Sequence, residues 1–300
     1  MRIGVDLGGT KIEAIALADD GATLGRQRVA TPAPDYGATL EAACSLVETV
    51  ERATGLRGSV GVGMPGALSP ATGRVKNANS TWLNGRPLRE DLERRLGRPV
   101  RLANDANCFA LSEAKDGAGM GASVVFGVIV GTGTGGGLVV EGKVVSGANG
   151  IAGEWGHNPL PWPRPEEWPG PPCYCGRTGC IETFLSGPGL AVAHRALTGQ
   201  ELDASAISAR AEAGDPEAEG TLALYADRMA RGLAMVMNVV DPNVIVLGGG
   251  LSQIASLYTR VPAAWARYVF SDRIDTRLLP PAHGDASGVR GAAWLWGPGE

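Results

Sequence analysis

The feature that most limits what this chain can fold into is a strand, glycine turn, strand unit that occurs twice. In the first copy, an apolar run at residues 2–7 leads through Gly8-Gly9-Thr10 into an alternating run at 11–18. In the second copy, the apolar run 124–130 leads through the glycine-rich segment 131–137 into a strand hairpin. Helical patterns follow each copy. Because the unit is duplicated, the sequence predicts an α/β fold with two lobes and a central cleft.

The spacing of apolar residues, together with Pro and Gly at the ends of helices, predicts the remaining elements. Pro87 opens a helix at a position that proline tolerates, and Gly97 ends it. We expect further strands at 24–30, 59–63, 100–103 and 244–247, and helices at 38–52, 105–113, 187–197, 203–213, 216–239 and 288–296. The N-terminal lobe is predicted to span 1–113 plus a C-terminal helix at about 288–300, and the other lobe to span 114–287 with a metal loop at 157–180.

Charge and cysteine usage exclude several classes of protein. The net charge is −4 with no run of Lys or Arg, which argues against nucleic acid as a partner. We find no signal peptide and no apolar run that could span a bilayer, so we expect a cytoplasmic protein with no membrane partner. Three of the five cysteines cluster with a histidine, which fits a metal in a reducing compartment better than disulfides. Cys44 and Cys108 lie in apolar helical patterns and are interpreted as core thiols.

The cysteine cluster predicts a metal site that also gathers carboxylates. One histidine and three thiols form a tetrahedral zinc set, and four protein ligands leave no open position for catalysis. We therefore expect a structural zinc ion; the alternative is a set of free thiols in a turn-rich loop. The ligands are His157, Cys173, Cys175 and Cys180. Glu154 lies three residues before the histidine and Glu182 lies two after the last cysteine, so the metal would bring together two acceptors for sugar hydroxyls.

The two remaining histidines have weaker signals. His194 lies in a helical pattern with no ligand spacing around it, so we expect a surface or hydrogen-bonded histidine. For His283, in Ala-His-Gly-Asp, the sequence allows either a structural or a functional role, and we favour the structural one.

Both glycine turns can bind phosphate. In the segment 6–11, glycine leaves backbone N–H groups uncovered, Thr10 offers a hydroxyl, and Asp6 can hold Mg²⁺. The alternative is an ordinary glycine hairpin. The second turn matches G-x-G-x-x-G at 131–136, but a strand follows it where a dinucleotide fold needs a helix, so that fold is rejected. Together the turns suit a triphosphate, and Gly248-Gly249-Gly250 could admit the adenosine.

Asp105 is the candidate base. It lies where a predicted strand ends and a helix begins, a position at which Asp and Asn also serve as helix caps. In the functional interpretation it accepts the proton of an attacking hydroxyl, and Asn104 holds a neighbouring hydroxyl.

Taken together, these motifs are similar to a known family. They are Asp6-Leu7-Gly8-Gly9-Thr10, Gly63-Met64-Pro65-Gly66, Asn104-Asp105-Ala106-Asn107, Gly131-Thr132-Gly133, Gly153-Glu154-Trp155-Gly156-His157, Cys173-x-Cys175-Gly176-x-x-Gly179-Cys180-x-Glu182 and Gly248-Gly249-Gly250. The chain resembles, from end to end, the ROK family of sugar kinases and repressors, within the actin/hexokinase-like ATPases. The resemblance implies two actin-like domains that close on ATP–Mg²⁺ and a hexose, with Asp105 as the base. Repressors of the family carry an N-terminal helix-turn-helix domain, and because this chain starts at the first strand, a kinase is favoured.

The same resemblance supplies the expected site residues. The sugar contacts are Asn79, Asn104, Asp105, Glu154, His157 and Glu182, with His157 also on zinc. The ATP contacts are Gly4, Val5, Asp6, Leu7, Gly8, Gly9, Thr10, Lys11, Thr132, Gly133, Thr134, Gly135, Gly136, Gly137, Gly249 and Gly250.

Two loops, 75–85 and 156–162, are closer to bacterial fructokinases and mannokinases than to the rest of the family. The sequence therefore predicts an ATP-dependent hexose 6-kinase acting on fructose, with mannose and glucose as further candidates. The alternatives are a kinase of N-acetylglucosamine or N-acetylmannosamine, a glucokinase, and a sugar-sensing regulator without turnover. Relatives in the family are often dimers, so a homodimer is a further expectation.

Overall fold

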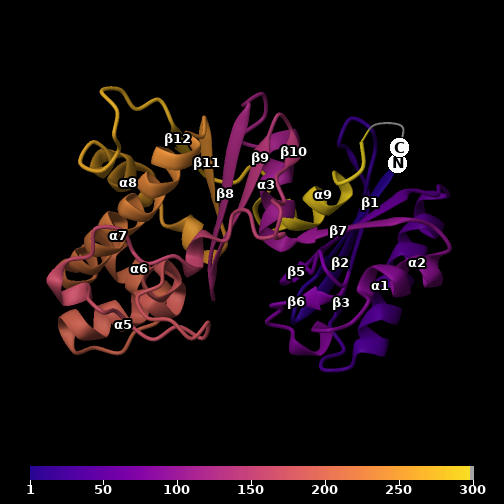
Figure 1. Cartoon of the computed structure of the whole chain (residues 1–300), viewed down its shortest axis with the longest axis horizontal. Coiled ribbons are helices and arrows are strands. Elements are labelled where there is room, and N and C mark those ends of the chain that lie inside the picture. The colour runs from indigo at the N-terminus through magenta and orange to yellow at the C-terminus, as the bar shows by residue number, and fades with distance from the viewer. Residues whose placement is uncertain (298–300) are drawn as a thin grey trace. The chain divides into compact units, whose positions relative to one another are not determined.

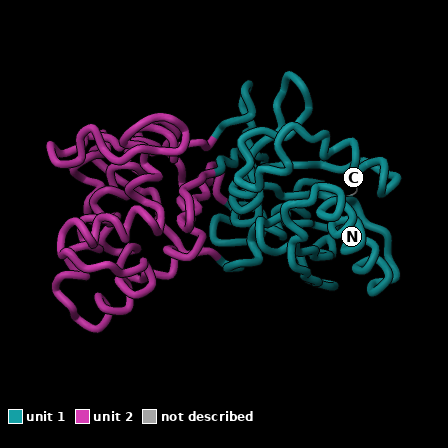
Figure 2. Tube along the Cα trace, turned by 90° about the horizontal axis from the view of Figure 1, so that it is seen from below, with its two compact units in different colours: residues 1–121, 137–152, 282–300 teal, residues 122–136, 153–281 magenta. Residues whose placement is uncertain are grey.

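The structure, a computed structural model, describes residues 1–297, and the end of the predicted segment 288–300 lies outside the described residues. The chain divides into two compact units (Figure 2). Unit 1 takes residues 1–121, 137–152 and the chain from 282 onward, and unit 2 takes 122–136 and 153–281. The chain therefore passes between the units four times, and 137–152 belongs to the first.

Unit 1 contains a five-stranded sheet of order β3-β2-β1-β4-β7 (Figure 1). Its strands are β1 (Arg2–Leu7), β2 (Lys11–Leu17), β3 (Thr23–Ala30), β4 (Ser59–Met64) and β7 (Val100–Asn104). The hairpin partners β1–β2 and β2–β3 are antiparallel, whereas β1–β4 and β4–β7 are parallel. A separate two-stranded ribbon pairs β5 (Ala67–Leu68) with β6 (Val75–Lys76).

Side-chain alternation along β1 gives this sheet two covered faces. Ile3, Val5 and Leu7 belong to the core cluster that includes Val47 and Val50 of α1 (Tyr36–Thr54). On the other face lies α9 (Ser287–Ala293), which contacts β1, β2 and β4. The remaining helices of the unit are α2 (Leu88–Leu96), α3 (Asp105–Lys115) and the 3₁₀ turns η1 (Thr81–Leu83) and η5 (Gly284–Ala286).

Glycines make the seam between α9 and its neighbours very close. A Cβ on Gly4 would lie 2.0 Å from the Val289 carbonyl oxygen, and one on Gly61 would lie 1.9 Å from that of Ala292. A Cβ on Gly291 of α9 would lie 1.6 Å from the Cys108 carbonyl oxygen of α3. Only residues without a Cβ allow backbones to approach this closely. Two glycines of the sheet therefore let α9 pack directly on β1 and β4, and a third lets it pack on α3.

The second sheet has the order β10-β9-β8-β11-β12 and repeats the first. Its strands are β8 (Val124–Val130), β9 (Thr134–Val140), β10 (Lys143–Val144), β11 (Val244–Gly248) and β12 (Arg277–Leu279). A hairpin is again followed by strands that pair in parallel, β8 with β11 and β11 with β12. The duplication predicted from the two glycine turns is confirmed by this shared strand order.

The helices of unit 2 pack around one long helix, α7 (Pro216–Val240), which contacts the other four. They are α4 (Ile181–Leu185), α5 (Gly187–Thr198), α6 (Ala204–Glu212) and α8 (Leu257–Trp265), with 3₁₀ turns η2 (Trp155–His157), η3 (Pro165–Glu167) and η4 (Gly250–Gln253). Asp215 begins α7 by accepting from the Glu217 and Ala218 N–H groups, and Pro216 takes the first helical position. No helix within residues 1–297 has both the length and the apolar character needed to cross a membrane.

Candidate active site

The first glycine turn exposes only its tip. Gly9 and Thr10 are exposed, and the Gly8 carbonyl oxygen accepts the Thr31 hydroxyl at 2.7 Å. A Cβ on Gly8 would lie 2.6 Å from the Lys11 carbonyl oxygen, and one on Gly9 would lie 3.3 Å from the hydroxyl of the buried Ser80. Gly8 is thus required by the turn itself, and the uncovered backbone lies at Gly9 and Thr10.

Earlier residues of the same motif have a packing role. Val5 and Leu7 are in the hydrophobic core, and Gly4 lies against α9. Lys11, at the start of β2, lies 3.7 Å from Asp285 in an ion pair. ATP contacts for the buried residues Gly4, Val5 and Leu7 stay a prediction, and packing accounts for them independently.

Asp6 has an unusual carboxyl group. It lies at the end of β1 on the face that α9 covers, and a Cβ on Gly288 would lie 3.8 Å from its Oδ2. Burial raises the pKa of Asp6 to about 7, and the neighbouring charges of Asp105 and Glu13 add to the shift. Burial and the charges of Asp6 and Asp105 raise the pKa of the Cys108 thiol. Cys108 is fully buried, which confirms it as a core thiol. Two carboxyl groups that repel each other favour a cation between them.

At the start of α3, Asn104 supplies the cap. Its Oδ1 accepts the Ala106 N–H at 2.9 Å, and its Nδ2 donates to the Gly66 carbonyl oxygen at 2.9 Å. Asp105 is exposed, and its Oδ1 also lies 2.8 Å from the Ala106 nitrogen. The alternative that Asp105 serves only as the helix cap is weakened, because its neighbour fills that position.

The loop before η1 is held by a single side chain. Asn84 pairs with both the N–H and the carbonyl oxygen of Ala78 at 2.9 Å. This fixes the backbone next to Asn79, which is exposed, and Ser80, which is buried against the first glycine turn. The predicted sugar contact Asn79 is therefore accessible on an ordered loop.

In unit 2, a carboxylate from another segment binds the second glycine turn. Glu182 Oε2 accepts the Thr134 N–H at 2.9 Å, and a Cβ on Gly133 would lie 2.8 Å from the same oxygen. Glu182 is the second residue of the short helix α4, two residues after Cys180. One side chain therefore joins the cysteine loop to the turn that follows β8.

The other glycines of this turn make room for Trp155. Its indole N–H donates to the Gly135 carbonyl oxygen at 3.0 Å, and its ring packs edge-on against Phe126 at 6.0 Å. A Cβ on Gly136 would lie 2.8 Å from the Trp155 ring. Gly137 lies equally close to the backbone of α3. The strand β9 after the turn confirms the rejection of a dinucleotide fold, and packing explains Gly136 and Gly137 without a phosphate.

The four predicted metal ligands converge. His157, Cys173, Cys175 and Cys180 place one donor atom each within 4.8 Å of one another. The Sγ atoms of Cys175 and Cys180 are 3.6 Å apart, and His157 Nδ1 is 3.6 Å from Cys173 Sγ. A tetrahedron with metal–sulfur bonds of about 2.3 Å has edges of about 3.8 Å, so these separations fit a zinc ion, whereas a disulfide would need about 2.05 Å.

Short backbone contacts shape the loop that holds these ligands. Isolated bridges pair Pro159 with Cys180 and Pro172 with Thr178. Gly176 and Gly179 have φ of 86° and 69°, a region that side chains disfavour. The fold of this loop brings His157 to the three cysteines, and none of these cysteines forms a disulfide.

A buried ion network anchors the proline-rich part of the loop. Glu167 accepts from Arg228 and Arg231 of α7 at 2.8 Å, and Arg231 also donates to the Trp162 carbonyl oxygen at 2.9 Å. These partners hold the pKa of Glu167 at about 2 although burial opposes the shift. No local pattern in the sequence marks this network, because Glu167 and its arginine partners lie far apart along the chain.

The polar side chain of Tyr174 lies against the metal cluster. The hydroxyl of Tyr174 lies 3.0 Å from His157 Nε2. Partial loss of solvent around this exposed side chain raises the pKa of Tyr174 to about 12, and the charges of Glu182 and Glu154 add to the shift. Glu154, His157 and Glu182 were predicted to share a site, and Tyr174 is an addition that the sequence did not single out.

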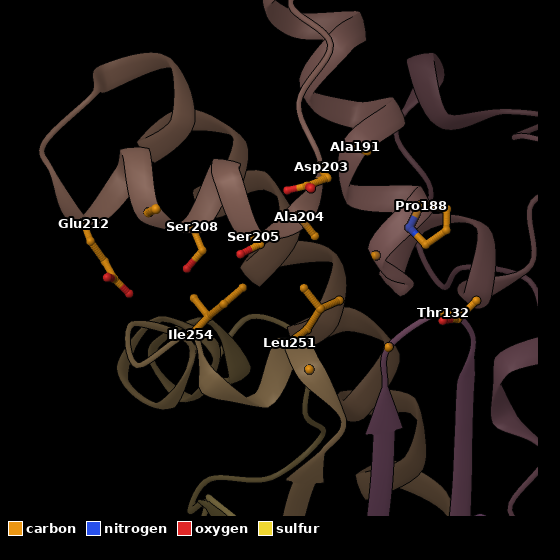
Figure 3. A pocket seen from close by; sticks show the side chains of 14 residues that line it. Thr132, Pro188, Ala191, Asp203, Ala204, Ser205, Ser208, Glu212, Leu251 and Ile254 are labelled. Carbon is orange, nitrogen blue, oxygen red and sulfur yellow. The ribbon is translucent and has the colours of Figure 1, made fainter. Parts of the chain in front are cut away.

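Unit 2 also contains a cavity of about 710 Å³ (Figure 3). Gly131, Thr132 and Gly250 line it, of which Thr132 and Gly250 were predicted ATP contacts. The other lining residues were missed: Gly187, Pro188, Ala191, Asp203, Ala204, Ser205, Ser208, Ala209, Glu212, Leu251 and Ile254. Most belong to α5 and α6, which had no ligand signal of their own in the sequence. Gly249 instead lies against β8, where a Cβ would be 2.3 Å from the Val130 carbonyl oxygen.

The remaining histidines have structural partners. His194 is fully buried and its Nδ1 lies 2.8 Å from the Thr221 hydroxyl, so the surface position considered for it is wrong. His283 Nε2 lies 3.0 Å from the carbonyl oxygen of Asp116, next to the N–H of Ala282 that donates to the buried Glu113. This supports the structural role that we favoured for His283.

Comparison with known proteins identifies the relatives of this chain. The sequence profile of the ROK family matches residues 2–298. An N-acetyl-D-glucosamine kinase of Salmonella typhimurium is 42% identical over 300 residues, covering 98% of this chain and 99% of the relative. A ROK hexokinase from Thermus thermophilus superimposes with a TM-score of 0.86 at 35% identity, over 98% of this chain and 96% of the other. A ROK family glucokinase from Streptomyces griseus, solved with glucose and AMPPNP, gives a TM-score of 0.78 at 30% identity, covering 98% of both chains.

Proposed function

Because the chain belongs to the ROK family, we propose that it is an ATP-dependent kinase of a hexose or an N-acetylhexosamine. The observation that carries this proposal is the convergence of His157 with three cysteines, together with Glu182, two residues after Cys180, whose carboxylate accepts the Thr134 N–H of the second glycine turn. With Glu154, three residues before His157, we propose that these carboxylates and the ring nitrogen bind adjacent sugar hydroxyls. A zinc ion in this cluster would fix His157 and, through Cys180, the start of α4 that carries Glu182.

The substrate that we propose is N-acetyl-D-glucosamine. Its support is the name of relatives that are 42% identical over nearly the full length of both chains. Glucose is the second candidate, since a glucokinase solved with glucose is 30% identical. Fructose, predicted from the loops 75–85 and 156–162, lacks support from these relatives, which favour the alternative substrate.

The phosphate donor that we propose is ATP, with its adenosine in the cavity of unit 2. In Figure 3, Leu251 and Ile254 face the residues of α6 across the cavity, and Pro188 lies beside Thr132. Apolar side chains suit the faces of a purine ring, and the hydroxyls of Ser205 and Ser208 suit polar base or ribose atoms. The glycine turns would then donate backbone N–H groups to the phosphates.

The proposed chemistry assigns a separate role to each polar group of the motifs. Asp105 accepts the proton of the sugar's 6-hydroxyl as that oxygen bonds to the γ-phosphorus, while the bond from this phosphorus to the bridging oxygen breaks and ADP leaves. Asn104 orients a neighbouring hydroxyl with its remaining N–H. Asp6 would hold Mg²⁺, which would supply neutralisation of charge on the phosphates. The protein otherwise contributes positioning and backbone N–H donors.

A coupled assay of ADP release tests the proposal. The panel holds N-acetylglucosamine, N-acetylmannosamine, glucose, mannose and fructose, each with ATP–Mg²⁺. We expect the highest kcat/KM for N-acetylglucosamine, by about 10-fold or more over fructose. Sugar binding without any ADP release would instead identify the non-catalytic regulator.

A cytoplasmic location and a homodimer remain part of this proposal.

A further inference from the structure

Tyr174 has an unusual combination of exposure and pairing. Its side chain is 83% exposed, so it has little packing to hold it in place. Its hydroxyl nevertheless lies 3.0 Å from His157 Nε2, and the two rings meet edge to face at 5.1 Å and 87°. The exposed end is therefore the ring, and the paired end is the hydroxyl.

A metal bound in the cluster would determine the direction of this hydrogen bond. His157 Nδ1 faces the thiols, at 3.6 Å from Cys173 Sγ, so Nδ1 would be the ligand nitrogen. A neutral imidazole that binds a cation through Nδ1 carries its proton on Nε2. In the zinc-loaded protein, His157 Nε2–H would therefore donate and the Tyr174 oxygen would accept.

A phenol in this position does what a sugar hydroxyl would do. Like a sugar hydroxyl, it can accept the His157 Nε2–H. A sugar hydroxyl could therefore replace the phenol as the acceptor for His157.

We propose that Tyr174 is a positioning residue that holds His157 in the sugar-free protein and is displaced from Nε2 by a sugar hydroxyl. The inference rests on the proposed function, because it takes the group that replaces Tyr174 to be a sugar hydroxyl. A histidine that binds a metal depends on a partner for its second nitrogen, and loss of that partner typically weakens metal binding about 10- to 100-fold. Tyr174 supplies the partner until the substrate does.

Two consequences follow for a Tyr174→Phe variant, which keeps the ring and loses only the hydroxyl. Without sugar, His157 Nε2 loses the partner that Tyr174 supplies, so the metal should leave about 10-fold faster. With sugar, no hydrogen bond has to be given up first, so the sugar Kd should fall by about 2- to 10-fold, the value of one net hydrogen bond.

The experiment uses the zinc-loaded full chain. Zinc release is followed with the chromogenic chelator 4-(2-pyridylazo)resorcinol, with and without saturating N-acetylglucosamine, and the sugar Kd is measured by calorimetry. Tyr36→Phe is the matched control, because it removes a phenol hydroxyl that is hydrogen-bonded to Asp91 in unit 1. It should behave as wild type in both measurements.

The outcomes separate the two roles. Faster zinc release in Tyr174→Phe that sugar abolishes, together with a lower sugar Kd, supports the proposal. Release at the wild-type rate without sugar overturns it, and so does a higher sugar Kd, which would make the phenol a sugar contact. If N-acetylglucosamine changes nothing in any variant, the proposed substrate is wrong, while faster release in Tyr174→Phe still supports the hold on His157.

Discussion

At the start of α3 two adjacent side chains, Asn104 and Asp105, have different environments. Asn104 uses both ends of its amide, one for the Ala106 N–H and one for the Gly66 carbonyl oxygen. Asp105 is exposed, and its charge acts on the buried Asp6. From sequence, either residue could have been the cap, and the structure assigns that position to Asn104.

We expect Asp105→Asn to reduce kcat by about 10²- to 10⁴-fold, the range typical for loss of a general base. The substitution preserves shape and removes only the proton acceptor, so the sugar Kd should change by less than about 3-fold. Initial rates of ADP release and calorimetry of sugar binding provide the two measurements. Asp19→Asn, at a carboxylate whose side chain is 73% exposed, is the control. Turnover close to wild type in Asp105→Asn would remove the base assignment.

Asp6 makes stability depend on pH in a direction that is unusual for an acid. Its pKa rises from 3.8 to about 7 on folding, so between these values the folded protein binds a proton that the unfolded chain has released. Stability contributed by protonated Asp6 is therefore full below about pH 4 and is lost as pH rises toward 7. At still higher pH the folded protein carries the buried charge.

Asp6→Asn should remove this loss. Each pKa unit corresponds to about 1.4 kcal/mol, so we expect the variant to gain about 2–4 kcal/mol over wild type near pH 8 and nothing near pH 4. Urea denaturation at both pH values, without nucleotide or Mg²⁺, measures the difference. An equal gain at both pH values would show that charge is not the cause.

At the scale of single elements, α7 shows how much context decides the effect of a glycine. Gly232 is packed against Trp155, where a Cβ would lie 2.9 Å from the ring, whereas a Cβ on Gly220 of the same helix would meet nothing within 4 Å. Both positions are helical, so propensity alone would favour alanine at each.

We therefore expect Gly232→Ala to destabilise by about 1–3 kcal/mol through overpacking. Gly220→Ala, the matched control, should stabilise by about 0.5–1 kcal/mol. Thermal unfolding of the two variants at equal concentration gives both signs in one experiment. Stabilisation by both would mean that the Trp155 ring shifts without cost.

Elements with strong local signals were predicted closely, and those with weak signals were not. Strands at 2–7 and 124–130 and the helix at 216–239 match β1, β8 and α7 within one residue, because their apolar periods are long and their caps are clear. α8, with Pro262 inside it, and the short β12 had no such signal and were missed. The predicted helix 288–296 is shorter, since α9 ends at Ala293.

Only those parts of the site whose residues follow a recognisable spacing along the sequence could be predicted. The cysteine spacing indicated the metal ligands, which the structure brings together. The Glu167 network and the α6 wall of the cavity depend on contacts between distant segments, and nothing local in the sequence marks them. The role of the glycines in the second turn was also ambiguous in the sequence. Close approach of a phosphate and close packing of the backbone both require a residue without a Cβ.

For the whole molecule, the metal cluster should matter locally before it matters globally. The four ligands and both glutamates are in unit 2, and unit 1 has its own core. Removal of zinc with a chelator, or the Cys175→Ala substitution, should raise the sugar KM about 10-fold or more while most helical signal in circular dichroism remains. Cys44→Ala, at a buried thiol of unit 1, should leave the KM unchanged. An unchanged KM in metal-free protein would show that the cluster does not shape the sugar site.

The glycine seam under α9 has a consequence for how the protein is made. One face of the first sheet is closed by Ser287–Ala293, against Gly4 and Gly61, which were translated more than two hundred residues earlier. At about 5–20 residues per second, this face waits roughly ten seconds or longer on the ribosome for its cover. The N-terminal unit thus finishes folding last, and the nascent chain offers that bare backbone surface to chaperones throughout the interval.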